Sequence, residues 1–191
     1  MFIKHQTLIL FPLLCLPLSG TTAPIVSSQT EYYPVCGNTV EEIRSDMDMK
    51  SPVHVHGFPY DAHTSWTIKW DFRWRGSGGT CKITELKVKV TIQQILPRLI
   101  DSVERAESVQ EIWNSYTIAL LHHEQEHKYL ALEAADKIEN TINSMPDSLS
   151  CQQLQRDANS LGNTIIAQYQ ALGTELDDTT NHGMKYGAVF P

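Results

Sequence analysis

The sequence predicts an α+β fold, with a small antiparallel β-sheet packed against a long helix and a second, C-terminal helix. Two segments between residues 64 and 92 alternate apolar and polar side chains, as strands with one buried face do. Between residues 108 and 172, apolar side chains recur at helical spacing, with a break around Pro146. A chain of 191 residues with 41% hydrophobic content suits one domain with a substantial core.

The first 23 residues have the pattern of a secretory signal peptide. Lys4 and His5 precede an apolar run at 8–16, and small residues follow at 19–23. The apolar run is too short to anchor the chain stably in a membrane. We therefore expect residues 1–23 to be removed. Residues 24–191 would then form one exported domain, periplasmic or extracellular, without an integral membrane segment.

The β part is expected to come first in the mature chain. Thr39 is suited to begin a short helix, because Glu41 and Glu42 would lie in its first turn, where they favour the helix dipole. The elements expected in this part are a linker at 24–29, a strand at 30–35, the short helix, a loop at 51–60, and a hairpin of strands 64–74 and 81–92 around the glycine-rich turn 76–79.

Two helices are expected to follow. Leu96 and Pro97 should end the β part, and helical character begins near Arg98. The spacing predicts a long helix over about 108–143 and a second over about 149–172, ended by Gly173. The segment 177–187 is polar and contains glycine, which predicts a loop, and the apolar residues 188–191 should dock on the core.

An exported protein folds in an oxidising compartment, where disulfides persist. The mature chain has Cys36, Cys81 and Cys151, which predicts one disulfide and one free thiol. Because Cys81 opens a strand and Cys151 opens a helix, a bond between them would tie the two parts together, worth roughly 4 kcal/mol. The alternative is that Cys36 pairs with one of the other two.

The long predicted helix carries an H-E-x-x-H motif. His123 and His127 are spaced i and i+4, so both imidazoles lie on one face, and they continue the apolar stripe that includes Leu120. Two such imidazoles can occupy two positions of a Zn²⁺ site and leave room for water. Glu124 is then placed to act as the general base of a hydrolase.

Two further interpretations of this motif remain open. The same residues also match H-x-x-E-H, the inverted order, in which Glu126 would be the base. His123 and His127 would be ordinary buried histidines if no metal binds.

A catalytic zinc site needs a third protein ligand. Leu130 and Glu133 occupy the positions where an extended metzincin motif has Gly and His, so that class is excluded. We favour His182, which lies in an Asn-His-Gly turn that can reach back to the motif. Three carboxylates on the preceding segment are also candidates: Asp178, Asp177 and Glu175.

Several short motifs occur together in a defined order, and together they resemble those of the bacterial DUF922 family. They are Tyr32-Tyr33-Pro34-Val35, the strand 64–70, His123-Glu124-x-x-His127, Cys151, and the segment from Thr180 through His182-Gly183 to 187–191. The resemblance covers about residues 30–191. It implies a predicted secreted zinc-dependent protease, and it favours Glu124 over Glu126 as the base. The family usually has a small residue where Glu126 stands. It usually has Tyr-Asp before the terminal His-Gly, which corresponds here to Leu176-Asp177 or to Glu175 and its neighbours, so this chain lacks the Tyr.

The sequence therefore predicts an exported zinc metallopeptidase that acts on a peptide or protein substrate. The ligands would be His123, His127 and His182, with Glu124 as the catalytic base. A non-catalytic zinc-binding envelope protein and an amidase that cleaves cell-wall peptides are the competing hypotheses. The formal charge of −7 argues against a nucleic-acid partner.

Overall fold

The computed structural model describes residues 23–55, 57–100 and 104–191, so the predicted signal peptide at 1–23 lies almost wholly outside the described residues. The α+β class is confirmed. The elements are β1 (Ile25–Val35), α1 (Val40–Lys50), β2 (Val53–Val55), β3 (Phe58–Tyr60), β4 (His63–Ser77), β5 (Thr80–Leu99), α2 (Glu107–Asn143), α3 (Cys151–Thr180) and the 3₁₀ helix η1 (Met184–Tyr186).

The main sheet has the strand order β1-β5-β4. As predicted, β4 and β5 form an antiparallel hairpin, which turns at Gly78 and Gly79, both with positive φ. β1 pairs with β5 in parallel, so the sheet is mixed rather than wholly antiparallel. The predicted linker at 24–29 is the first half of β1, because Ile25 already pairs with Lys89. This half of β1 is exposed on both faces and therefore has no alternating pattern.

β5 continues through Pro97 to Leu99, beyond the point where the sequence predicted the end of the β part. The β4 ladder stops where His63 pairs with Ile95, so at Pro97 the strand has a neighbour on one side only. A proline is tolerated at such a place because only one ladder can lose a donor. Residues 51–60, predicted as a loop, contain the small antiparallel sheet of β2 and β3.

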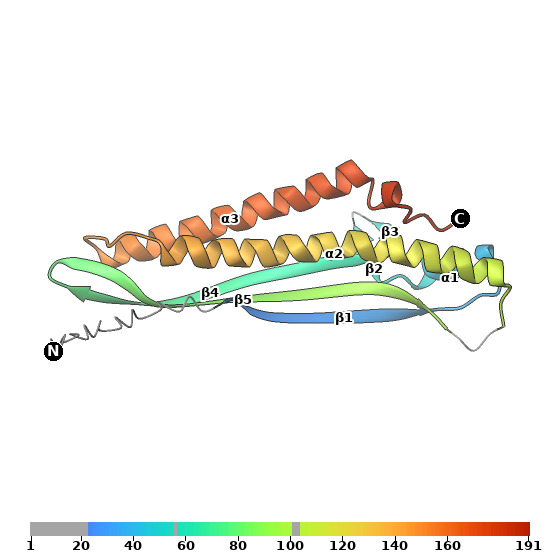
Figure 1. Ribbon diagram of the computed structural model, residues 1–191, viewed down its shortest axis with the longest axis horizontal. Helices are drawn as coiled ribbons and strands as arrows, with labels where there is room; N and C mark the ends of the chain where they lie inside the picture. Colours follow the sequence, from blue (N-terminus) through green and yellow to red (C-terminus); the bar gives the residue numbers. More distant parts are fainter. Residues whose placement is uncertain (1–22, 56, 101–103) are drawn as a thin grey trace, which may run out of the picture.

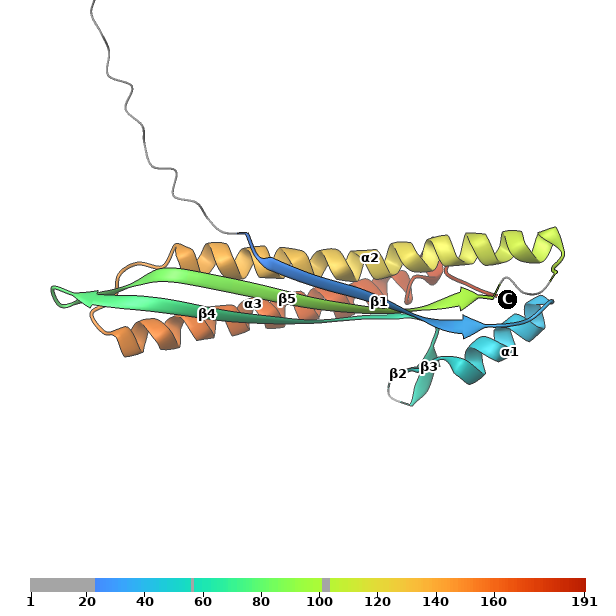
Figure 2. The same ribbon diagram turned by 90° about the horizontal axis from the view of Figure 1, so that it is seen from below.

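Both long helices cover the same face of the main sheet, and α2 runs along its length (Figures 1 and 2). α2 spans Glu107–Asn143, close to the predicted 108–143. Helical character does not begin near Arg98, because Arg98 belongs to β5. The inner face of β5 packs against small side chains of α2, which allow the helix to approach closely. The main core includes Val88, Val90 and Ile92 from the sheet and Ala131, Ala134, Ala135 and Ile138 from α2.

The C-terminal segment docks on α2, as predicted. Phe190 is buried between the rings of Trp113 and Tyr116, in a second core that α1 and the end of β5 complete. On its way to this core the chain after α3 passes His123, where a Cβ on Gly183 would lie 3.0 Å from Cβ of the histidine.

The predicted disulfide between Cys81 and Cys151 is present, and Cys36 is a free thiol. The bond joins the start of β5 to the first residue of α3, at the hairpin end of the molecule (Figure 1). None of the helices in the described part of the chain combines the length and apolar character that crossing a membrane requires.

α3 does not end at Gly173 but continues to Thr180. Gly173 lies opposite α2, where a Cβ would be 3.6 Å from Nδ1 of His127. This is an ordinary contact distance, so Gly173 lies where α3 contacts α2, within the helix rather than at its end. The helix ends at Asn181, whose φ of 52° is left-handed.

Candidate metal centre

The H-E-x-x-H residues lie near the middle of α2, on the face that is turned toward β4 and α3. His123 and Glu124 are buried, with 3% and 4% of their surfaces exposed. The Nε2 atoms of His123 and His127 are 3.2 Å apart, and the two rings are nearly perpendicular. The i, i+4 spacing therefore brings both imidazoles to one point, as the motif predicts.

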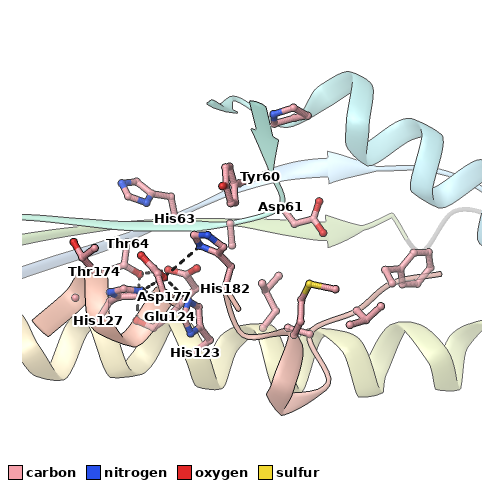
Figure 3. A pocket seen from close by; sticks show the side chains of 18 of the residues that line it. Tyr60, Asp61, His63, Thr64, His123, Glu124, His127, Thr174, Asp177 and His182 are labelled. Carbon is pink, nitrogen blue, oxygen red and sulfur yellow. Dashed lines mark hydrogen bonds and ion pairs between the residues drawn. The ribbon is translucent and has the colours of Figure 1, made fainter. Parts of the chain in front are cut away.

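Asp177 completes this group from α3. Its Oδ1 atom lies 3.1 Å from Nε2 of His123 and 3.0 Å from Nε2 of His127. One donor atom from each of the three residues lies within 4.8 Å of the other two. Figure 3 shows the three side chains converging between the helices and β4. Asp177 reaches this position because α3 continues beyond Gly173.

The donor set fits a divalent zinc ion. Two imidazole nitrogens and one carboxylate oxygen make three protein ligands, which in catalytic zinc sites leave a fourth position for water or substrate. The three donors converge from two different helices, and two of them are basic ring nitrogens that face each other in a largely buried space. Ordinary buried histidines would not require two imidazoles and a carboxylate to meet at one point. The structure thus supports a possible His-His-Asp metal site.

The charges of the site are mutually dependent. Burial disfavours the ionised Asp177, but hydrogen bonds from His123 and His127 outweigh it and hold the pKa of that carboxyl well below its usual range. Burial likewise opposes the charged form of His127, yet the hydrogen bond to Asp177 outweighs it and raises the pKa of the imidazole. A negative carboxylate beside two imidazoles is also the arrangement that a cation would stabilise.

The hydroxyl of Thr180 lies beside Nδ1 of His123, the ring nitrogen that does not contact Asp177. Thr180 donates its only proton to the carbonyl oxygen of Leu176 at 2.7 Å, so Oγ1 acts as an acceptor toward its other neighbours. One of these is Nδ1 of His123 at 3.4 Å. A proton on Nδ1 would leave the lone pair of Nε2 for a bound cation, which would replace the hydrogen bond from His123 to Asp177.

The site opens into a cavity of about 560 Å³. His123, Glu124, His127 and Asp177 all line it. The rest of the lining includes Trp66 and Thr64 from β4, Tyr169 and Thr174 from α3, Leu120 from α2, and Met184, Ala188, Val189 and Phe190 from the C-terminal segment.

His182, the third ligand favoured by the sequence, lies beside this group. Its Nδ1 is 3.5 Å from Oδ1 of Asp177, and its ring packs edge-on against Tyr60 (Figure 3). Nearly half of the side chain is exposed. The group of converging donors therefore consists of His123, His127 and the candidate carboxylate Asp177. Ligation by His182 stays a prediction. The candidate carboxylates Asp178 and Glu175 are exposed and do not line the cavity.

The two candidate bases are separated by the structure. Glu124 lines the cavity with the three donor residues, whereas Glu126 does not, and its carboxylate raises the pKa of Tyr186. The arrangement therefore favours Glu124, in agreement with the H-E-x-x-H order rather than the inverted one.

These features define an α+β domain with a possible His-His-Asp metal site between a sheet and two helices. The chain belongs to the DUF922 family, described as a bacterial protein of unknown function, whose model matches residues 30–183. The match confirms the resemblance predicted from the ordered motifs, and the family description gives no activity. No curated protein and no solved structure matches the chain.

Proposed function

We propose that the protein is a zinc-dependent metallopeptidase, with His123, His127 and Asp177 as zinc ligands and Glu124 as the general base. One observation carries this proposal: the three donor residues and a buried glutamate line the same cavity. A structural metal would need the donors alone, whereas a hydrolase also needs a base beside an accessible position.

Each residue then has a defined role. When bound, Zn²⁺ polarises a water molecule and the scissile carbonyl, which makes attack on the amide possible near neutral pH. Glu124 directly follows His123 on α2 and lines the same cavity as the donor residues. It accepts a proton from the attacking water and passes that proton to the leaving amine.

The cavity supports a peptide as the substrate class. Its lining combines the polar donor group with apolar side chains from two directions: Tyr169 on α3, and Leu120 and Met184 near the C-terminal segment. A peptide can place side chains against both parts while its amide lies at the donors. The same chemistry would serve cleavage of cell-wall peptides, which makes such peptides the second substrate to test.

An exported location is part of the proposal. It is supported by the signal-like pattern at residues 1–23 and by the disulfide between Cys81 and Cys151, since disulfides persist in oxidising compartments.

The position of His182 favours a second candidate function, that of a non-catalytic zinc-binding protein. Structural zinc sites are closed by four protein ligands. His182 is the third histidine beside Asp177, with Nδ1 3.5 Å from Oδ1. If it also bound zinc, the fourth position would be filled and Glu124 would have no reacting group beside it.

Two measurements on the mature chain test the proposal. The first is zinc content of the wild type and of the His123→Ala, Asp177→Ala and His182→Ala variants. We expect about one zinc per chain, as three ligands bind one ion, lost in the first two variants and kept in H182A. The second is hydrolysis of a mixed peptide library and of cell-wall peptides by the wild type and by Glu124→Gln. We expect cleavage by the wild type and none by zinc-loaded E124Q.

The outcomes separate the two candidate functions. Loss of zinc in H182A together with no hydrolysis by the wild type would favour the non-catalytic site. A wild type that binds no zinc after reconstitution would remove the chemical basis of the proposal. Unchanged hydrolysis by E124Q would exclude Glu124 as the base.

A further inference from the structure

We propose that Thr64 is a positioning residue, whose hydroxyl holds the Glu124 carboxylate in the orientation needed for proton transfer, and that Gln94 fixes the direction of this hydroxyl. The inference rests on the proposed function of Glu124 as the general base. Neither residue belongs to the metal group, and each comes from a strand rather than from the motif helix.

The first observation is a polar row on an otherwise apolar sheet face. Thr64 of β4 and Gln94 of β5 are directly paired across the hairpin. The two neighbouring rows on the same face pair Trp66 with Ile92 and Ile68 with Val90. Thr64 and Gln94 are nonetheless buried, with 6% and 1% exposed. Burying such groups costs free energy unless they are hydrogen-bonded, so their partners explain why they are there.

Those partners lie on Glu124. The Thr64 hydroxyl donates to Oε2 of Glu124 at 2.6 Å, and the carbonyl oxygen of Glu124 lies farther away, at 3.2 Å. Nε2 of Gln94 donates to Oγ1 of Thr64 and to the same carbonyl oxygen, at 3.3 Å in both cases. The polar row therefore binds both the backbone and the side chain of the proposed base.

The proton count gives the direction of each bond. The amide nitrogen of Gln94 can only donate, so the Thr64 oxygen accepts from it. A hydroxyl has a single hydrogen, and the nearest acceptor for it is Oε2 of the Glu124 carboxylate. The second possible acceptor, the backbone carbonyl, already receives a bond from Gln94. The hydroxyl is thus directed at Oε2, which anchors this oxygen and leaves Oε1 for the reacting proton.

Such an arrangement matters because proton transfer depends on position. A misplacement of about 1 Å at a reacting group can reduce the rate about 10²-fold. Glu124 has several rotatable bonds, and among the described contacts only Thr64 bonds to its carboxylate. Removal of the hydroxyl would let the carboxylate turn, without a change in the metal ligands.

The test compares Thr64→Val, which keeps the shape and removes the hydroxyl, with Thr64→Ser, which keeps the hydroxyl. The matched control is Thr67→Val, on the exposed outer side of the same strand. We expect T64V to lower kcat by about tenfold to a hundredfold, with KM and zinc content unchanged. T64S should retain most of the wild-type kcat, and T67V all of it.

A kcat for T64V equal to that of T67V would overturn the proposal. Hydrolysis that survives in E124Q would instead overturn the proposed function, so the two failures are distinguishable. Crystal structures of zinc-loaded wild type and T64V give a readout without substrate: the Glu124 carboxylate should turn in T64V, and an unchanged orientation would overturn the proposal. If T64V does not fold, Gln94→Met, which removes the donor to Thr64, should lower kcat in the same way, and an unchanged kcat would overturn the proposal.

Discussion

The Asp177 carboxylate lies 3.0 Å from Nε2 of His127, although the two residues are 50 positions apart and belong to different helices. This contact joins the last turns of α3 to the middle of α2. The metal group therefore depends on how the two helices pack, and not on the motif helix alone. The predictions below test this dependence and the stability of the fold around it.

Substitution of Asp177 should weaken zinc binding more than substitution of its neighbour. Loss of an outer partner of a zinc ligand typically costs up to about 100-fold in affinity, so loss of a direct ligand in Asp177→Ala should exceed that. Competition with a chelator of known affinity measures the change. Asp178→Ala is the control, because Asp178 is exposed on the same turn. Equal affinities for D177A and D178A would exclude Asp177 as a ligand.

Gly173 should accept alanine and reject leucine. A Cβ at this position would lie 3.6 Å from Nδ1 of His127, which is an ordinary contact distance. Gly173→Ala should therefore raise the free energy of unfolding by up to about 1 kcal/mol through helix propensity, with zinc retained. Gly173→Leu would place further carbons against the imidazole and should reduce zinc affinity. Urea denaturation and zinc titration measure the two effects; tight zinc binding by G173L would contradict the packing role.

Removal of the disulfide should destabilise the fold without removing the metal site. The Cys81→Ser/Cys151→Ser double variant should lose about 2–5 kcal/mol of unfolding free energy. Zinc binding by the folded protein should persist, because the bond lies at the opposite end of α3 from Asp177. Cys36→Ser, which removes the free thiol, is the control and should match the wild type in denaturation experiments.

Asp61 should make stability depend on acidic pH. Burial disfavours its charged form, but hydrogen bonds from Arg44 and Tyr116 outweigh burial and lower the pKa of the carboxyl. A lowered folded-state pKa stabilises the protein above the unfolded value of about 4, and this contribution disappears as the pH falls toward the folded value.

Asp61→Asn should therefore be less stable than the wild type at pH 7, and the difference should shrink below about pH 4. Urea denaturation at pH 7 and pH 3 measures it. Asp71→Asn, at an exposed position on β4, is the control. A difference between D61N and the wild type that stays constant over this range would show that the charge of Asp61 does not contribute.

The sequence predicted the elements whose patterns are local. Alternation indicated the hairpin, helical spacing placed the start of α2 within one residue of Glu107, and the positions of Cys81 and Cys151 indicated the disulfide. The two histidines and Glu124 follow from their spacing on one helix.

The parts that were not predicted depend on tertiary contacts. The first half of β1 is exposed on both faces, and only its pairing with β5 makes it a strand. Gly173 favours a helix end by local propensity, but α3 continues past it, with Gly173 facing His127 of α2. The third member of the metal group was uncertain for the same reason: Asp177 comes into range only on the extended helix. The sequence does contain a signal for the pair of Thr64 and Gln94: each is a polar residue on the otherwise apolar face of its strand.

α3 has few buried residues: among its 30 residues, the buried ones are Leu154, Ala158, Gly162, Ile165 and Thr180. Its first residue is bonded covalently to β5, and its last turns would be joined to α2 through a shared cation. Reductant and chelator would therefore release opposite ends of the same helix. With both links in place, α3 would be held to the rest of the domain at both ends, and with it the side of the cavity that Tyr169, Thr174 and Asp177 line.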